Sequence, residues 1–209
     1  LATGARWRRD GAGRTHGAGI AGLADAANVF TPDDLMDGPL PEGTVAVYDD
    51  DGGYHATVLA EALVRAGRRV VYVTPEELVA PWGQYTLEYR HVRKRLASLG
   101  VQVRVSQCLR ALDGHELVLE DAWSGETHLL HVDALVTVTS RLPEDALHQA
   151  LQARADEWAG AGLASLQRIG DAEAPGLIAH AVYAGHRAAQ ELGEPKHGDV
   201  PFKRHFHHG

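Results

Sequence analysis

The feature that most constrains the fold is the regular alternation of strand-like and helix-like segments from residue 44 onward. Short apolar runs predict strands at 44–48, 69–73 and 101–105, and apolar residues with helical spacing predict helices at about 55–66 and 86–99. Strands and helices that alternate in this way form a parallel sheet with crossover helices. The sequence therefore predicts an α/β fold with a Rossmann-like, three-layer domain.

The segments around this unit have other patterns. "HELVLED" and "THLLHVDALVTVT" predict a short antiparallel excursion and then a buried strand at 134–138. A further helix follows Pro143, the glycines of "AGAGLASLQRIGDAEAPG" indicate a change of domain, and a last helix is expected at about 176–192. The segment before residue 44 lacks this alternation, so we expect it outside the unit, with Thr31 and Pro32 opening one helical turn.

The turn after the first predicted strand is acidic. A dinucleotide-binding unit has glycines there, because backbone N–H groups must approach the pyrophosphate. Here Asp49, Asp50 and Asp51 fill the turn, and only Gly52 and Gly53 follow. These carboxylates would repel a phosphate. An acidic residue that holds the ribose normally follows the second strand, but in "VVYVTPEE" Thr74 and Pro75 stand there, and Glu76 and Glu77 come two and three places late. We therefore favour a domain that keeps the fold without the nicotinamide ligand. A metal held by the three aspartates is a weaker alternative, because consecutive residues lack a known ligand spacing.

Another segment imitates a phosphate loop. "GAGRTHGAGI", at 11–20, is rich in glycine, but no strand is predicted before it and no amphipathic helix after it. A glycine motif has meaning only between a strand and a helix. We predict a surface loop.

Charge, cysteine count and hydropathy exclude several classes of protein. The formal net charge is −8 and the basic residues are scattered, which gives no support for a nucleic-acid partner. The single cysteine, Cys108, excludes an internal disulfide framework and fits a cytoplasmic location. No apolar run approaches the ~20 residues of a membrane span. Because the sequence starts abruptly at Leu1, we expect it to be a piece of a longer protein.

A candidate ligand site lies near the end of the chain. In "LQRIGDAEAPGLIAHAVYAGHRAA" a strand is expected to end at Ile169, and the last helix follows Pro175. Asp171 could accept hydrogen bonds from a ribose or ribitol hydroxyl while the helix start faces a phosphate. The alternative is that Asp171 or Glu173 only caps the helix.

These motifs carry a resemblance to a known family. "ATGA" near the start and "GDAEAPGLIAHAVYAGHR" near the end are similar to the two-part signature of flavoprotein disulfide-reductase-like domains. "TLEYRHVRKRL", "LVTVTSRLPEDALHQAL" and "PFKRH" resemble the C-terminal nucleotide-binding region of the trimethylamine, dimethylamine and histamine dehydrogenase family, relatives of old yellow enzyme and 2,4-dienoyl-CoA reductase. The resemblance covers nearly the whole chain.

The resemblance implies a domain organisation and a set of cofactors. It implies a glutathione reductase-like FAD/ADP-binding domain, only part of which is in this chain. Its first piece and a linker are expected at 1–42, and its return piece and the tail at 161–209. A degenerate NAD(P)-like Rossmann domain at 43–160 is inserted between these pieces. ADP or FAD would bind at residues that match the family motifs, namely Thr3, Gly4, Gly170 and Asp171. FMN and a 4Fe-4S cluster would lie in an N-terminal TIM barrel of the same polypeptide, outside this sequence. No catalytic or metal-binding residue of this chain is implied.

The resemblance also implies a function, beside which two alternatives stay open. The parent enzyme would be an amine dehydrogenase, a homodimer that oxidises a small amine at FMN and passes electrons through the cluster to an electron-transfer flavoprotein or similar acceptor. The first alternative is an NAD(P)H-dependent 2,4-dienoyl-CoA or enoate reductase, which needs a glycine turn at 49–53. The second is a nucleotide-free scaffold for docking or oligomerisation. The tail histidines His205, His207 and His208 are interpreted as adventitious metal binders.

Overall fold

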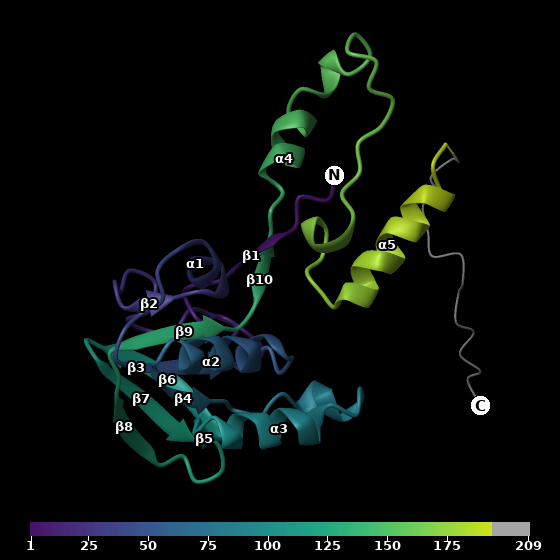
Figure 1. The fold of residues 1–209 in the computed structure, drawn as a ribbon. Coiled ribbons are helices and arrows are strands. Elements are labelled where there is room, and N and C mark those ends of the chain that lie inside the picture. The colour runs from purple at the N-terminus through teal and green to yellow at the C-terminus, as the bar shows by residue number, and fades with distance from the viewer. Residues whose placement is uncertain (194–209) are drawn as a thin grey trace, which may run out of the picture. The chain divides into compact units, whose positions relative to one another are not determined.

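The computed structural model describes residues 1–193 and contains two compact units (Figure 1). Unit 2 is Arg6–Leu142, and unit 1 consists of Leu1–Ala5 together with the chain from Pro143 onward. Unit 2 is thus inserted in the chain between two pieces of unit 1. The motif "PFKRH" and the tail histidines His205, His207 and His208 lie outside the described residues.

Unit 2 is built on a five-stranded parallel sheet of order β2-β9-β3-β4-β5. Every residue of the interior strand β9 is buried, as is expected of a parallel sheet covered on both faces. The predicted α/β fold is confirmed. The strands are β2 (Val29–Phe30), β3 (Thr44–Asp49), β4 (Arg69–Val73), β5 (Gln102–Arg104) and β9 (Ala134–Val138).

Helices cover one face of this sheet and an antiparallel meander covers the other. Along β3, Val45 and Val47 pack in a core with residues of α2 (His55–Arg65) and α3 (Tyr89–Ser98). The alternate residues Ala46 and Tyr48 pack in a second core with residues of the meander. Because successive side chains of a strand point to opposite faces, the unit has three layers. The meander consists of β6 (Gln107–Asp113), β7 (Glu116–Asp121) and β8 (Thr127–His131).

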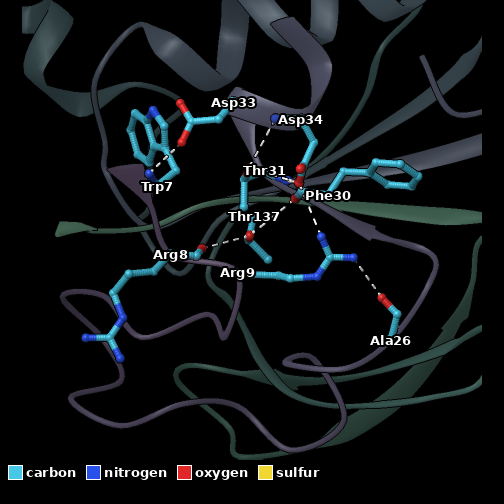
Figure 2. Close-up of polar contacts among 9 residues, drawn as sticks. All are labelled: Trp7, Arg8, Arg9, Ala26, Phe30, Thr31, Asp33, Asp34 and Thr137. Carbon is cyan, nitrogen blue, oxygen red and sulfur yellow. Dashed lines mark hydrogen bonds and ion pairs between the residues drawn. The ribbon is translucent and has the colours of Figure 1, made fainter. Parts of the chain in front are cut away.

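The segment before residue 44 belongs to unit 2, which differs from our expectation. Strand β2 pairs with β9, and the Thr137 hydroxyl on β9 lies 3.1 Å from the carbonyl oxygen of Arg8 and 3.4 Å from that of Phe30 (Figure 2). The compact unit therefore begins at Arg6 rather than at residue 43, and it ends at Leu142 rather than at residue 160. A strand of two residues is too short to produce a periodic sequence signal.

The predicted helical turn is present as α1 (Pro32–Asp37), and polar contacts hold it against the segment that starts unit 2 (Figure 2). The Thr31 hydroxyl accepts a hydrogen bond from the Asp34 backbone N–H at 3.3 Å, which caps the helix. The Asp33 carboxylate accepts one from the Trp7 backbone N–H at 2.8 Å, and the Arg9 guanidinium lies 3.3 Å from the Asp34 carboxylate. Residues 6–42 are therefore an integral part of the domain.

Unit 1 contains α4 (Ala146–Gln152), α5 (Ile178–Gln190) and a short 3-10 helix at Gly170–Ala172. The Leu1 amino group donates to the Gln167 carbonyl at 2.6 Å, and the Ile169 N–H donates to the Leu1 carbonyl at 2.9 Å. This is the bonding pattern of adjacent parallel strands. Strands β1 (Ala5–Trp7) and β10 (Arg141–Pro143) form a two-stranded sheet at the residues where the chain passes between the units.

Other short elements complete the described chain. They are the 3-10 helices at Pro81–Gln84 and Ala155–Glu157. Within residues 1–193, no helix combines the length and the apolar composition that crossing a bilayer requires.

Candidate functional site

The acidic turn lies where an open α/β sheet normally binds its ligand. Strand β3 is flanked by β4, which follows it in the chain, and by β9, which comes much later, so the strand order reverses beside β3. Ligands of such sheets bind at the carboxyl ends of the strands on either side of this reversal. The backbone N–H groups of Asp50 and Asp51 donate to the Val138 carbonyl at 2.9 and 3.1 Å, which ties the turn to the end of β9.

The first aspartate of the turn is a structural residue. Asp49 is fully buried, and its carboxylate accepts hydrogen bonds from the Asp51 N–H at 3.1 Å and the Gly52 N–H at 2.9 Å. The Tyr72 hydroxyl on β4 donates to its other oxygen. Burial raises the pKa of Asp49 to about 7, and these hydrogen bonds offset the effect only in part. Asp49 therefore shapes the turn from inside and offers nothing to a ligand.

The second aspartate binds a distant part of the same chain. Asp50 is 1% exposed, and its two oxygens accept hydrogen bonds from the Thr15 N–H at 2.8 Å and the Thr15 hydroxyl at 2.7 Å. Thr15 lies in the glycine-rich segment that resembles a phosphate loop. A Cβ atom added to Gly13 would lie 2.3 Å from the Asp50 carboxylate, so the approach requires glycine. The sequence analysis did not predict this contact.

The third aspartate contacts the start of the helix that follows the turn. The Asp51 carboxylate lies 3.3 Å from His55 Nδ1, at the start of α2. Its backbone carbonyl lies 3.4 Å from Arg14 Nη1, and Arg14 Nη2 pairs with Glu76 at 2.6 Å. The three carboxylates thus have different partners, and among residues 1–193 no group of three acidic, histidine or cysteine side chains could hold a metal ion.

We name residues 10–20 the strap. The Ile20 N–H donates to the Asp10 carbonyl at 2.7 Å, which brings the two ends together, and the Ser140 hydroxyl donates to the Ala12 carbonyl at 2.6 Å just beyond β9. The strap is therefore fastened at the ends of β3, β4 and β9. It was predicted as a surface loop; residues 14, 15 and 17–19 are exposed, whereas Gly11, Ala12 and Ile20 are buried.

The predicted ligand residues near the N-terminus lie in unit 1, beside the segment that leads into α4. The Thr3 hydroxyl donates to the Glu144 carbonyl, and the Glu144 N–H donates to the Gly4 carbonyl at 2.9 Å. Gly4 has a φ of +82°, a conformation that favours glycine. Local backbone pairing thus fixes both residues of the "TG" pair.

The other predicted pair lies close to the N-terminal segment. Ile169, which is bonded to Leu1, directly precedes Gly170 and Asp171. The structure therefore brings the chain segments that carry the two motifs together within unit 1. Asp171 is partly buried, and its carboxylate accepts a hydrogen bond from the Gly176 N–H at 3.1 Å.

The start of the last helix bears on the capping alternative. Helix α5 begins at Ile178, two residues later than predicted, and the Leu177 N–H donates to His180 Nδ1 at 3.1 Å. Asp171 bonds instead to Gly176, which lies before the helix. This bond orders the loop that leads into α5.

The fold of this chain is also found in a protein of known structure. The chain has the same fold as a flavoprotein disulfide reductase from Escherichia coli, with a TM-score of 0.59 at 18% identity over 91% of this chain and 43% of that chain. No protein-family model matches the sequence.

Three other proteins are more similar to this chain. Dimethylamine dehydrogenase from Hyphomicrobium sp. (strain x) is 32% identical over 98% of this chain. The structure of histamine dehydrogenase from Rhizobium sp. 4-9 is 41% identical, with a TM-score of 0.90 over 98% of this chain. That of 6-hydroxypseudooxynicotine amine oxidase from Pseudomonas geniculata N1 is 40% identical, with a TM-score of 0.86 over 92% of this chain.

These similarities confirm the resemblance inferred from the sequence. The chain is a homologue of the dimethylamine and histamine dehydrogenases over nearly its whole length. It spans 30% of the dimethylamine dehydrogenase, 32% of the histamine dehydrogenase chain and 28% of the amine oxidase chain.

Proposed function

We propose that this chain is the C-terminal nucleotide-binding region of an iron-sulfur flavoprotein that oxidises a small amine. The observation that carries the proposal is the similarity to two amine dehydrogenases and an amine oxidase over at least 92% of the chain. Because the chain spans about a third of these proteins or less, the reaction itself would take place in another part of the polypeptide.

The proposed role of unit 1 is to hold the adenine nucleotide of ADP or FAD. Its motif residues Thr3, Gly4, Gly170 and Asp171 lie on segments joined by backbone hydrogen bonds. A carboxylate at the end of an extended segment can accept hydrogen bonds from sugar hydroxyls. The bond from Gly176 supports this role, because it fixes the Asp171 carboxylate beside the loop that leads into α5.

The remaining machinery would lie upstream in the same polypeptide. We propose an N-terminal TIM barrel with FMN, which would accept a hydride from the amine, and a 4Fe-4S cluster as the exit for electrons. An electron-transfer flavoprotein or similar acceptor, a homodimeric parent enzyme and a cytoplasmic location complete the proposal. The lone Cys108 is buried, which agrees with a structural thiol in this part of the protein.

The principal alternative is an NAD(P)H-fed enoate or 2,4-dienoyl-CoA reductase. That function needs an open dinucleotide crevice in unit 2. The contact between Asp50 and Thr15 argues against it, because the strap lies where the pyrophosphate would bind. A nucleotide-free scaffold is the other alternative, and nucleotide content distinguishes it.

The test compares Asp171→Ala with Glu173→Ala in the full-length protein. Acid extraction followed by chromatography measures adenine nucleotide and FMN separately. We expect Asp171→Ala to lower the adenine nucleotide at least severalfold while FMN stays at the wild-type level, and Glu173→Ala, an exposed residue two positions away, to change neither. A full equivalent of adenine nucleotide in both variants would show that Asp171 has only a structural role. Absence of adenine nucleotide from the wild type would favour the scaffold.

A further inference from the structure

We propose that the strap is an internal ligand of unit 2, and that Asp50 selects it over a dinucleotide. Thr15 of the strap would occupy the place of the pyrophosphate, and Arg14 of the strap would occupy the place of the adenosine ribose. This inference concerns unit 2 alone and does not depend on the nucleotide site proposed in unit 1.

The pyrophosphate position is filled by backbone and hydroxyl donors. In a dinucleotide-binding unit the turn after the first strand presents N–H groups to an anion. Here the roles are reversed, because the turn presents the Asp50 carboxylate and the strap supplies the Thr15 N–H and hydroxyl as donors at 2.8 and 2.7 Å. The closeness of Gly13, where an added Cβ would meet the carboxylate at 2.3 Å, leaves no room for a phosphate between strap and turn.

The ribose position is filled by a guanidinium. The residue that binds a nucleotide ribose lies near the end of the second strand of such a unit. Beyond β4, Glu76 pairs with Arg14 at 2.6 Å, and the Arg14 guanidinium lies 5.8 Å from the centre of the Trp82 ring. Arg14 Nη1 also faces the Asp51 carbonyl at 3.4 Å. Arg14 thus contacts Glu76 and Trp82, which follow β4 in the chain, and Asp51 in the turn after β3.

The chemistry of the crevice explains the choice of ligand. At these contacts the crevice offers two carboxylates and a carbonyl, all acceptors, and the strap offers N–H, hydroxyl and guanidinium donors. A buried carboxylate without donors is costly, so Asp50 and the strap stabilise each other. A dinucleotide would place phosphate oxygens, which are also acceptors, against these carboxylates and this carbonyl. The crevice therefore suits a donor-rich peptide and excludes an anion.

Amide hydrogen exchange in the full-length protein tests the proposal at the Thr15 N–H. We compare the wild type with Asp50→Ala, and use Asp51→Ala as the matched control, because the Asp51 side chain pairs with His55 and not with the strap. We expect the Thr15 amide to be protected from exchange in the wild type and in Asp51→Ala. In Asp50→Ala its exchange should be faster by roughly tenfold or more. Protected amides of Val47 and Val136 in the sheet would show that the variant is folded.

The same exchange experiment with added NADPH separates an internal ligand from a lid. If the strap is the resident ligand, a large excess of NADPH over the protein leaves the Thr15 protection of the wild type unchanged. Three results would overturn the proposal: free exchange of Thr15 in the wild type, equal protection in Asp50→Ala, or deprotection of Thr15 by NADPH. In the last case the strap would be a lid that a nucleotide displaces.

Discussion

Two turns of this protein each connect an extended segment to a helix, but their acidic residues differ in burial. The turn at Asp49–Asp51 lies between β3 and α2 in unit 2, and the turn at Gly170–Asp171 lies between an extended segment and α5 in unit 1. In the first, Asp49 and Asp50 are at most 1% exposed and each is hydrogen-bonded within the unit. In the second, Asp171 is only partly buried. An acidic residue after a strand is therefore a ligand-site candidate only where the fold leaves it accessible.

The same contrast extends to the two units. Unit 2 has two apolar cores, one on each face of its sheet. In unit 1 no residue of α5 is buried. Its large apolar residues Ile178, Val182 and Tyr183 are at least 54% exposed. Substitutions at closely packed positions of unit 2 should therefore be costly, and substitutions at open positions of either unit should be cheap.

The largest effect is expected for Gly22→Ala in unit 2. Gly22 has a φ of +82°, and an added Cβ would lie 2.0 Å from the Leu112 carbonyl oxygen, so the backbone must move. We expect the free energy of unfolding, measured by denaturant titration, to fall by roughly 3 kcal/mol or more.

Two matched variants complete this experiment. Gly67 also has a φ of +82° but no atom within 4 Å of an added Cβ, and Gly170 in unit 1 has a φ of +60° with only an ordinary contact to Ala181 at 3.5 Å. Replacing either with alanine should cost about 1–2 kcal/mol, the penalty of the left-handed conformation alone. Equal losses in all three variants would contradict the difference in packing.

A graded effect, spread over several pH units, is expected from the titration of Asp49. The pKa of this carboxyl is about 7 in the folded chain and about 3.9 when unfolded. Between these values the folded state binds more protons than the unfolded state, so its contribution to stability falls as pH rises from about 4 to about 7, by at most ~1.4 kcal/mol per pH unit.

Asp49→Asn should remove this slope, because an amide does not titrate in this range, while its oxygen can still accept the hydrogen bond from the Gly52 N–H. Denaturant titrations at several pH values, with Asp51→Asn as the control that keeps the slope, measure the effect. A slope that persists in Asp49→Asn would assign it to another group.

The smallest effect is expected for Cys108→Ser. Cys108 is 6% exposed on β6, and burial raises the pKa of its thiol, which makes it a poor nucleophile. We expect little reaction with a thiol reagent in the native protein, and unchanged flavin and cluster content in the full-length variant, with a loss of about 1 kcal/mol in stability. Loss of flavin or cluster would place this cysteine in the redox machinery.

The sequence predicted the regular elements of unit 2 and missed its least regular part. Strands β4 and β9 have the predicted bounds, because apolar runs that are buried on both faces leave a strong local pattern. The bond between Thr15 and Asp50 joins residues 35 positions apart and follows no period, so no local pattern could reveal it. The bond between Asp171 and Gly176 spans five residues, and for that reason a capping role could be weighed from the sequence.

The most direct test of the central claim, that unit 2 binds its own strap and no nicotinamide nucleotide, is a calorimetric titration of the full-length protein with NADH and NADPH. The account predicts no saturable binding with a Kd below about 1 mM. Saturable binding tighter than this would contradict the account if it is weakened by a larger side chain in the turn (Gly52→Val or Gly53→Val) and is unaffected by Asp171→Ala.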